Sequence, residues 1–376
     1  MASSFLGMME GKTTVGFVLL LALGILFVVK GGDWFVDAAS WIAEVSGIPT
    51  FIIGATIVSV ATTIPEILVS SISAGQGQAS MAIGNAVGSV NCNIALIMAI
   101  SLVFIAPTLK RKDYVAKICI LLATIALLWG LSSNGTFNWW NAIIILAMFV
   151  GFLVENVISA KKHSDTFLND KGIETIAGNS PKGNGILFDY FEKKEAKKIT
   201  LKKTGMVIER KDIAKNIFVF ILGAATIFVG AQLMCDNGAA LARKLEVPEG
   251  IIGVTILAVG TSLPELVTAI TSIVKKKADL SVGNIIGANI IDLSLILPLC
   301  TFITLGKTGQ PLPVDAQSLT IDFPFCIAVA GFALIPALIM GKFKRWQGIL
   351  LLCGYVTYVT LLILNTVHVI TIFPTT

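Results

Sequence analysis

The sequence predicts an all-α, polytopic membrane protein with ten transmembrane helices in two inverted five-helix repeats. Hydrophobic residues make up 55% of the 376 residues, only 14% are charged, and the mean hydropathy is +0.86. Soluble domains carry roughly 25% charged residues. Apolar runs at 15–29, 118–130 and 349–364 approach the ~20 residues that cross a bilayer. A polar motif that recurs 199 positions later in the chain supplies the evidence for a repeat.

The hydropathy pattern divides the chain into ten spans and one polar connection. The first and sixth spans are long and end in a more polar stretch, which is typical of a strongly tilted helix. The lysine- and glutamate-rich segment between spans five and six predicts a solvated tether with one short amphipathic helix. The spans are 14–43, 48–74, 79–106, 113–132, 138–159, 214–244, 250–274, 279–305, 321–341 and 347–370.

The repeat divides the chain into three units. Residues 1–159 form the first transmembrane repeat, 160–213 the basic loop, and 214–376 the second repeat. About a third of positions 52–93 are identical to the residues 199 positions later. Because the identities include Pro, Glu, Asn and Thr, they indicate duplication and not merely a shared apolar composition.

Basic residues indicate the orientation of the chain. Four clusters follow spans three, five, seven and nine, all odd-numbered, although Arg243 and Lys244 oppose the trend. The positive-inside rule therefore predicts a multi-pass protein of the cell membrane with a cytoplasmic large loop and both termini outside. Five spans per repeat then place the second repeat upside down, an arrangement typical of secondary transporters.

The net charge of +5 does not indicate nucleic-acid binding, because the basic residues lie between apolar runs. The six cysteines fall in apolar runs and form no CxxC pair, so neither a disulfide framework nor a zinc site is expected. The first apolar run has no A-x-A-like site, and we expect no cleavable signal peptide. Asp33, Asp37 and Asp236 are interpreted as helix-end charges, with a role at an ion entrance as the alternative.

The duplicated motif places a glutamate directly after a proline inside a membrane span. The two copies are ATTIPE, with Pro65 and Glu66, and GTSLPE, with Pro264 and Glu265. Proline removes a backbone donor and breaks the helical hydrogen bonds, so we expect the carbonyls around Ser59–Ala61 and Ala258–Gly260 to lose their partners. Such carbonyls are tolerated in a membrane only where they line a polar cavity or meet a cation.

The downstream segments, GNAVGSVNCN and GNIIGANIID, contribute Asn93 and Asp292, each 27 residues after its glutamate. At 1.5 Å per residue, a helix can leave the bilayer centre, turn and return over that distance. We therefore expect Glu66, Asn93, Glu265 and Asp292 to meet. Oxygen donors without sulfur or imidazole favour Na⁺ or Ca²⁺ over zinc or copper. Glycines at every fourth position predict close helix approach.

These paired segments resemble the alpha repeats of the cation/Ca²⁺ exchanger superfamily, specifically its sodium/calcium exchanger branch of prokaryotic type. The resemblance implies exchange of Na⁺ for Ca²⁺ by alternating access, with long first and sixth helices that slide as a gate. It places Glu66, Asn93, Glu265 and Asp292 at the centre of the metal site. It further implies hydroxyl ligands Thr62, Thr63, Ser89, Thr261 and Ser262, and backbone carbonyls of Ser59 and Ala258.

Three positions depart from that pattern. Ala288 stands where a serine matching Ser89 is expected, which puts the Na⁺ stoichiometry in doubt. Val90 replaces an asparagine that the second repeat keeps as Asn289, and Ala61 replaces a glycine. None of these departures removes a carboxylate.

The expected partners are the lipid bilayer and the transported ions Na⁺ and Ca²⁺, with no organic cofactor, nucleic acid or obligate protein partner. An H⁺-coupled exchanger of Ca²⁺ or another divalent cation is the nearest alternative, since it would use the same glutamates. A cation channel with an acidic ring is disfavoured by the inverted halves. An intramembrane protease is disfavoured because no GxGD or GxSG segment occurs; we therefore expect no enzymatic activity.

Overall fold

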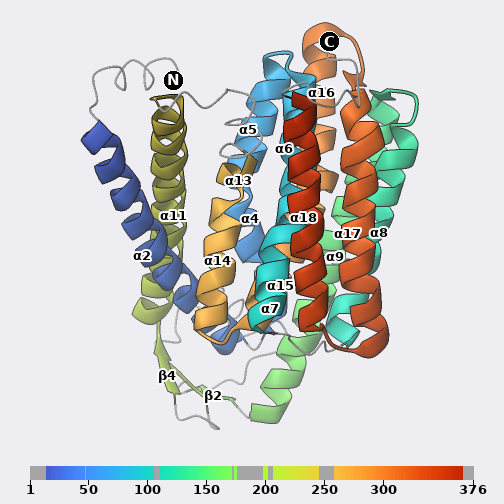
Figure 1. Ribbon diagram of the computed structural model, residues 1–376. Helices are drawn as coiled ribbons and strands as arrows, with labels where there is room; N and C mark the ends of the chain where they lie inside the picture. Colours follow the sequence, from blue (N-terminus) through green and yellow to red (C-terminus); the bar gives the residue numbers. More distant parts are fainter. Residues whose placement is uncertain are drawn as a thin grey trace.

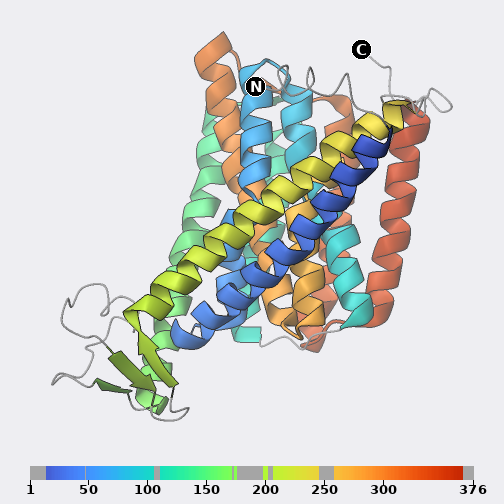
Figure 2. The same cartoon turned by 90° about the vertical axis from the view of Figure 1, so that its left-hand side faces the viewer.

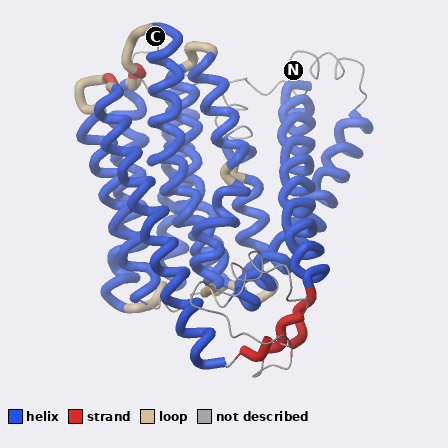
Figure 3. Tube along the Cα trace, turned by 180° about the vertical axis from the view of Figure 1, so that it is seen from behind, coloured by secondary structure: helices blue, strands red, loops and turns tan. Residues whose placement is uncertain are grey.

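A computed structural model describes residues 14–46, 48–105, 111–171, 173–175, 198–201, 206–244 and 258–366. The chain forms a bundle of long helices, with short strands confined to its two ends (Figures 1 and 3). Within the described residues, eight helices are long and apolar enough to cross a membrane, and the bent pair Thr50–Thr62 and Ile64–Gly75 forms a ninth. Many large apolar side chains are exposed along them, as lipid contact requires.

The first half of the described chain consists of broken and continuous helices. The α-helices are α2 (Thr14–Ser46), α3 (Thr50–Ile53), α4 (Ser59–Thr62), α5 (Ile64–Gly75), α6 (Ala79–Cys92), α7 (Ala99–Phe104), α8 (Arg111–Leu131) and α9 (Trp139–Lys171). Two π-helical turns interrupt them, η1 (Gly54–Val58) and η2 (Asn93–Met98).

The second half repeats this order. Its α-helices are α11 (Arg210–Lys244), α13 (Ala258–Thr261), α14 (Leu263–Val274), α15 (Ala278–Ile291), α16 (Leu297–Thr308), α17 (Phe323–Met340) and α18 (Arg345–Thr366). The π-helical turns are η4 (Asp292–Ile296) and η5 (Ser318–Asp322). The seventh predicted span corresponds to α13 and α14, and its first residues, 250–257, lie outside the described residues.

The long helices α2 and α11, which correspond to the first and sixth predicted spans, lie side by side and run antiparallel at a strong tilt across one face of the bundle (Figure 2). Their tilt confirms the prediction made from their length. Glycines allow them to touch: a Cβ on Gly31 would lie 2.9 Å from the Gly223 carbonyl, and one on Gly230 would lie 2.8 Å from the Gly24 carbonyl. Gly24 and Gly31 match Gly223 and Gly230 at the 199-residue offset, so the contact is itself nearly two-fold symmetric.

The turn after α5 lies at the upper end of Figure 1, whereas the turn after its counterpart α14 lies at the lower end. Equivalent elements therefore point in opposite directions. The lower end also holds the last residues of α7, the first residues of α8, the turn between α17 and α18 and the strands that follow α9. The described chain begins and ends at the upper end. The described basic residues after α14 (Lys275, Lys276 and Lys277) and after α17 (Lys342, Lys344 and Arg345) therefore lie at the same end of the bundle, and the side of the membrane that they face stays a prediction.

The polar connection between the halves differs from the expected tether with one short helix. Helix α9 continues to Lys171, α11 begins at Arg210, and β2 (Ile173–Thr175), β3 (Lys198–Leu201) and β4 (Met206–Glu209) form an antiparallel sheet. Alternating β-branched and polar residues in these short strands favour pairing. At the opposite end, β1 (Thr136–Phe137) pairs with β5 (Leu312–Pro313). The remaining residues between 160 and 213 lie outside the described part of the chain.

Candidate metal-ion site

Both halves contain a helix that breaks at the residue before the Ile-Pro-Glu or Leu-Pro-Glu segment. The first break lies at Thr63, where α4 and α5 meet at an angle of 44°. The second lies at Ser262, between α13 and α14. Each break has the same backbone hydrogen bond, from the Ile67 N–H to the Thr63 carbonyl (3.1 Å) and from the Leu266 N–H to the Ser262 carbonyl (3.0 Å). The duplicated sequence therefore gives the same local structure twice.

The expectation that the Ser59 carbonyl loses its helical partner is wrong. The Thr63 N–H donates to this carbonyl at 2.9 Å, and the Thr62 hydroxyl approaches it at 3.4 Å. The carbonyl deprived by Pro65 is that of Ala61, four residues before the proline. The Ser59 carbonyl keeps a second lone pair, so a role as ligand stays a prediction. Ala258 begins α13, and its backbone role is likewise not tested.

Glu66 and Glu265 occupy the first turns of α5 and α14, and each is only 1% exposed. A helix N-terminus stabilises negative charge because its N–H groups point toward it. The hydroxyl of Thr63 donates to Glu265 Oε1 at 3.4 Å, which joins the break in the first half to the glutamate of the second. The two glutamates and Asp292 lie close enough to interact electrostatically. The structure therefore brings the acids of both halves together in the interior.

Asn93 and Asp292, both 1% exposed, stand at the first residues of the π-helical turns η2 and η4. A π-helical turn changes the direction in which the following side chains point, and such turns occur often at functional sites. The Asn93 amide donates to Asn289 Oδ1 at 3.0 Å. This bond fixes the orientation of the amide, with its nitrogen toward Asn289.

A second, symmetric pair of hydrogen bonds also crosses between the halves. The Thr62 hydroxyl donates to Asn284 Oδ1 at 3.2 Å, and the Thr261 hydroxyl donates to Asn85 Oδ1 at 3.3 Å. At the 199-residue offset Thr62 corresponds to Thr261 and Asn85 to Asn284. Sequence reasoning did not place the two asparagines or Asn289 in the site. The sequence contained a signal for all three. Asn85 and Asn284 are identical at the 199-residue offset, and Asn289 lies within the second duplicated segment.

Several buried oxygens at this position have no hydrogen-bond partner among the described residues. They are both oxygens of Glu66, Glu265 Oε2, Asp292 Oδ1, Asn93 Oδ1, Ser89 Oγ and Ser262 Oγ. Buried polar atoms normally have partners, and this donor set has the chemistry that Na⁺ and Ca²⁺ prefer. Within the described residues, no three side chains of His, Cys, Asp or Glu gather as a metal cluster by themselves. Besides the carboxylates, the possible ligand atoms are the amide oxygen of Asn93 and the hydroxyl oxygens of Ser89 and Ser262.

Glycines bring α15 into backbone contact with the broken span of the first half. A Cβ on Gly287 would lie 2.5 Å from the Ala55 carbonyl oxygen and 2.6 Å from Ser59 Oγ. A Cβ on Gly283 would overlap the Phe51 carbonyl. The glycine spacing therefore permits close approach here. The segment expected opposite Gly84 and Gly88 lies outside the described residues.

Three ion pairs among the described residues were not anticipated. Lys117 of α8 is fully buried and pairs with Glu155 of α9, with its ammonium 5.5 Å from the Phe51 ring centroid. Lys275, in the turn after α14, pairs with Asp33 at 3.3 Å and Asp37 at 2.7 Å. The ion pairs of Lys275 with Asp33 and Asp37 therefore join the tilted helix α2 to the second repeat.

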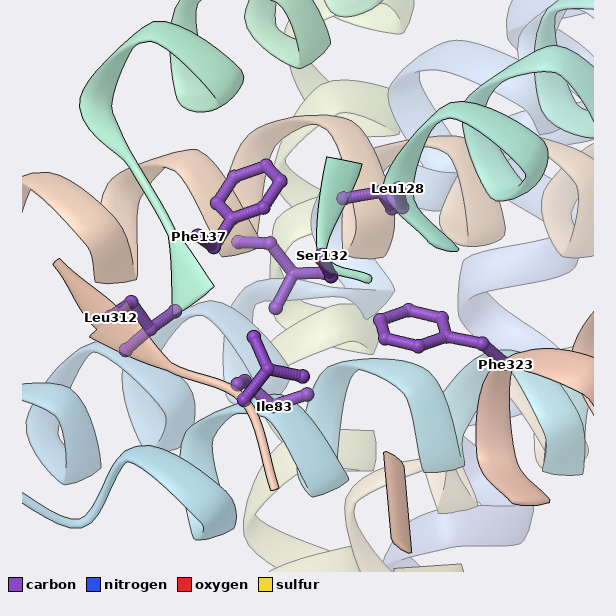
Figure 4. Close-up of a pocket in the computed structure, with 8 residues that line it drawn as sticks. Ile83, Leu128, Ser132, Phe137, Leu312 and Phe323 are labelled. Carbon is purple, nitrogen blue, oxygen red and sulfur yellow. The ribbon is translucent and has the colours of Figure 1, made fainter. Parts of the chain in front are cut away.

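A cavity drawn in Figure 4 is separate from the acids in chemistry and in lining. Seven apolar side chains and Ser132 line it, and none of the eight belongs to the predicted ion site. Phe137, Leu312 and Phe323 are among the labelled side chains that surround it. This cavity offers no oxygen-rich surface for a cation.

Comparison with known proteins identifies the family. The model of the family described as sodium/calcium exchanger protein matches residues 16–157 and 215–364. The sodium/calcium exchanger MaX1 of Methanosarcina acetivorans is 32% identical over 366 residues, covering 93% of this chain and 99% of its own. This chain belongs to the sodium/calcium exchanger family.

A second curated protein and a solved structure are also similar to this chain. The inner membrane protein YrbG of Escherichia coli is 29% identical, with 91% of this chain and 95% of its own covered. A solved structure of the sodium-calcium exchanger NCX_Mj, soaked with Na⁺ and Sr²⁺, has a TM-score of 0.71 at 23% identity and covers 93% of this chain and 99% of its own. The latter likeness establishes the fold, that of a helical polytopic membrane protein. As an exchanger of this family, the protein is a transporter and not an enzyme.

Proposed function

We propose that this exchanger couples Na⁺ movement to Ca²⁺ movement in the opposite direction, with both ions bound at the buried carboxylates. The observation that carries the proposal is the meeting of Glu66 and Glu265, each 1% exposed, at the breaks of two equivalent helices from opposite halves. The family assignment supports Ca²⁺ exchange, and the names of relatives such as MaX1 support Na⁺ as the driving ion.

Competition for one set of oxygens gives the coupling. Carboxylates in the bilayer interior are unfavourable without a counter-charge, and a bound cation supplies it. Ca²⁺ and Na⁺ that share Glu66, Glu265 and Asp292 would exclude one another. Without bound cations, the carboxylates keep their negative charge in the low-dielectric interior while the protein changes conformation. This cost disfavours the conformational change. Exchange is then faster than flux of either ion alone.

We assign the moving element to α2 and α11. Their glycine contacts join the two helices into one unit, while the acids lie on the broken helices behind them. A shift of this unit against the rest of the bundle would uncover the acids from one side and then the other. Residues 1–159 and 214–376 would form the two repeats, with 160–213 as the connection.

The protein would lie in the cell membrane with its basic connections in the cytoplasm and its termini outside. Support comes from the shared location of the α14–α15 and α17–α18 connections, which carry lysines, at one end of the bundle. Positive connections are retained on the cytoplasmic side during insertion.

The test is Ca²⁺ uptake into proteoliposomes loaded with Na⁺, compared with matched vesicles loaded with choline. We expect uptake only where Na⁺ can leave, and inhibition by external Na⁺. Uptake that ignores the Na⁺ gradient but follows an imposed pH gradient would replace Na⁺ with H⁺ as the coupled ion. Flux of Ca²⁺ that needs no counter-ion would indicate a channel and refute exchange.

A further inference from the structure

A fourth buried acid, Asp322, lies outside the duplicated segments. It ends the π-helical turn η5 and is 3% exposed, within the span Ser318–Met340. Ionisable residues inside a membrane are rare and usually serve a function. The proposed ion site does not use Asp322, so its role needs a separate explanation.

Asp322 is part of a hydrogen-bonded group that joins three helical segments. The Tyr358 hydroxyl of α18 donates to Asp322 Oδ1 at 2.9 Å. Asn91, in the last turn of α6, donates through Nδ2 to the Asp322 carbonyl at 3.2 Å and approaches the Tyr358 hydroxyl at 3.4 Å. Gln317 Nε2 approaches Asp322 Oδ2 at 3.4 Å. Phe325 stacks on the Tyr358 ring with centroids 4.3 Å apart, which holds that ring in place.

The hydrogen bonds of this group reach Asn91, which lies two residues before Asn93 of the proposed ion site. Asn91 is fully buried, and the next residue, Cys92, is 1% exposed. Helix α6 then ends, and η2 begins at Asn93. The direction in which Asn93 points therefore depends on how the last turn of α6 is rotated. Asp322 and Tyr358 fix that rotation through Asn91.

The two halves differ at the position of Asn91, and the difference follows the type of side chain that each half contributes to the proposed ion site. At the 199-residue offset, Asn91 corresponds to Ile290, which is fully buried, while Asn93 corresponds to Asp292. An ionised carboxylate can present either oxygen to a cation, whereas an amide can present only one of its two terminal atoms. The amide ligand thus tolerates less rotational error than the carboxylate. The polar anchor occurs in the half that carries the amide.

We propose that Asp322 and Tyr358 are positioning residues that hold Asn91, and with it the turn that carries Asn93, so that Asn93 Oδ1 faces the transported ion. The inference rests on the proposed ion site. Asn93 Oδ1 is buried and has no hydrogen-bond partner among the described residues, as a ligand atom should be. Asn289 sets which end of the amide faces the ion, and the Asp322 anchor sets the backbone from which it extends.

The experiment measures the KM for Ca²⁺ and the maximal rate of Na⁺-driven uptake in proteoliposomes. For Tyr358→Phe and Asp322→Leu, which both remove the hydrogen bond between Tyr358 and the Asp322 carboxylate, we expect the KM for Ca²⁺ to rise about twofold to twelvefold, the range for one lost hydrogen bond. Their maximal rates should stay within about twofold of wild type on that same scale. Asp322→Asn retains an acceptor for the Tyr358 hydroxyl and should restore the wild-type KM. Thr301→Val is the matched control, because among the described residues this buried hydroxyl donates only to the Leu297 carbonyl of its own helix.

The outcomes separate the two proposals. Asn93→Ala with a wild-type KM would overturn the ion site itself. Asn93→Ala with a raised KM but Tyr358→Phe with a normal KM would overturn only the positioning role. A lower maximal rate or melting temperature with an unchanged KM would also overturn it, since that pattern indicates structural support alone. Tyr358→Phe removes a single hydroxyl, so it carries the test even if Asp322→Leu does not fold.

Discussion

Replacing Gly287 with alanine should weaken Ca²⁺ binding although the change removes no oxygen atom. The new Cβ would lie 2.5 Å from the Ala55 carbonyl oxygen and 2.6 Å from Ser59 Oγ, where ordinary contacts begin at 3.4 Å. Helix α15 and the broken span opposite must therefore separate by the difference, about 0.9 Å. Ca²⁺–oxygen distances span only about 0.3 Å. The forced displacement is about three times larger, so the oxygens of the two halves could no longer share one ion.

The effect on stability is smaller than the effect on binding. Overpacking costs about 1–3 kcal/mol, and replacing a helical glycine by alanine returns roughly 0.5–1 kcal/mol. We therefore expect a modest fall in melting temperature in detergent and a KM for Ca²⁺ raised at least about tenfold. Gly306→Ala is the control, since a Cβ there meets nothing within 4 Å. It should keep the wild-type KM and melt at the same or a higher temperature.

The assay is Na⁺-driven Ca²⁺ uptake over a range of external Ca²⁺, alongside thermal unfolding of the purified protein. A Gly287→Ala protein with wild-type KM would refute the reasoning, because it would show that this helix contact does not set the geometry of the ion site. Misfolded protein would be recognised by its elution from a sizing column, and Gly287→Ala would then be compared with Gly306→Ala only in the monodisperse fraction.

The remaining predictions concern charge and helix contact. Glu66→Gln and Glu265→Gln should each abolish Na⁺-driven uptake while the protein elutes and melts like wild type, and near-normal flux in either would count against a shared site. Gly31→Val should slow uptake, because its side chain would separate α2 from α11 where a Cβ already lies 2.8 Å from the Ile227 nitrogen; an unchanged rate would contradict their motion as one unit. Lys117→Met should destabilise the protein by about 3 kcal/mol because it removes the ion-pair partner of Glu155. Adding Glu155→Met should recover most of this loss, and thermal unfolding of both variants measures the two effects.

Sequence alone predicted the elements that depend on composition and on duplication. Apolar length predicted the membrane spans, and the 199-residue offset predicted two equivalent helix breaks, which appear at Thr63 and Ser262. The strands β2–β4 were not predicted, because their pairing joins segments that are short and individually polar. The Ser59 carbonyl was wrongly expected to be free, since the proline affects the carbonyl four residues back and not the whole preceding turn.

The sequence determined which residues could bind a cation, because oxygen chemistry and the proline breaks are local properties of the chain. Only the tertiary structure decided which of them face one another across the two halves. The Thr63–Glu265, Thr62–Asn284 and Asn93–Asn289 contacts join residues about two hundred positions apart. Such contacts depend on how closely α15 packs against the broken span, and that distance is set by the absence of side chains at Gly283 and Gly287. The hydrogen-bonded group at Asp322 was likewise not predicted, because it joins three helical segments whose relative rotation no local pattern encodes.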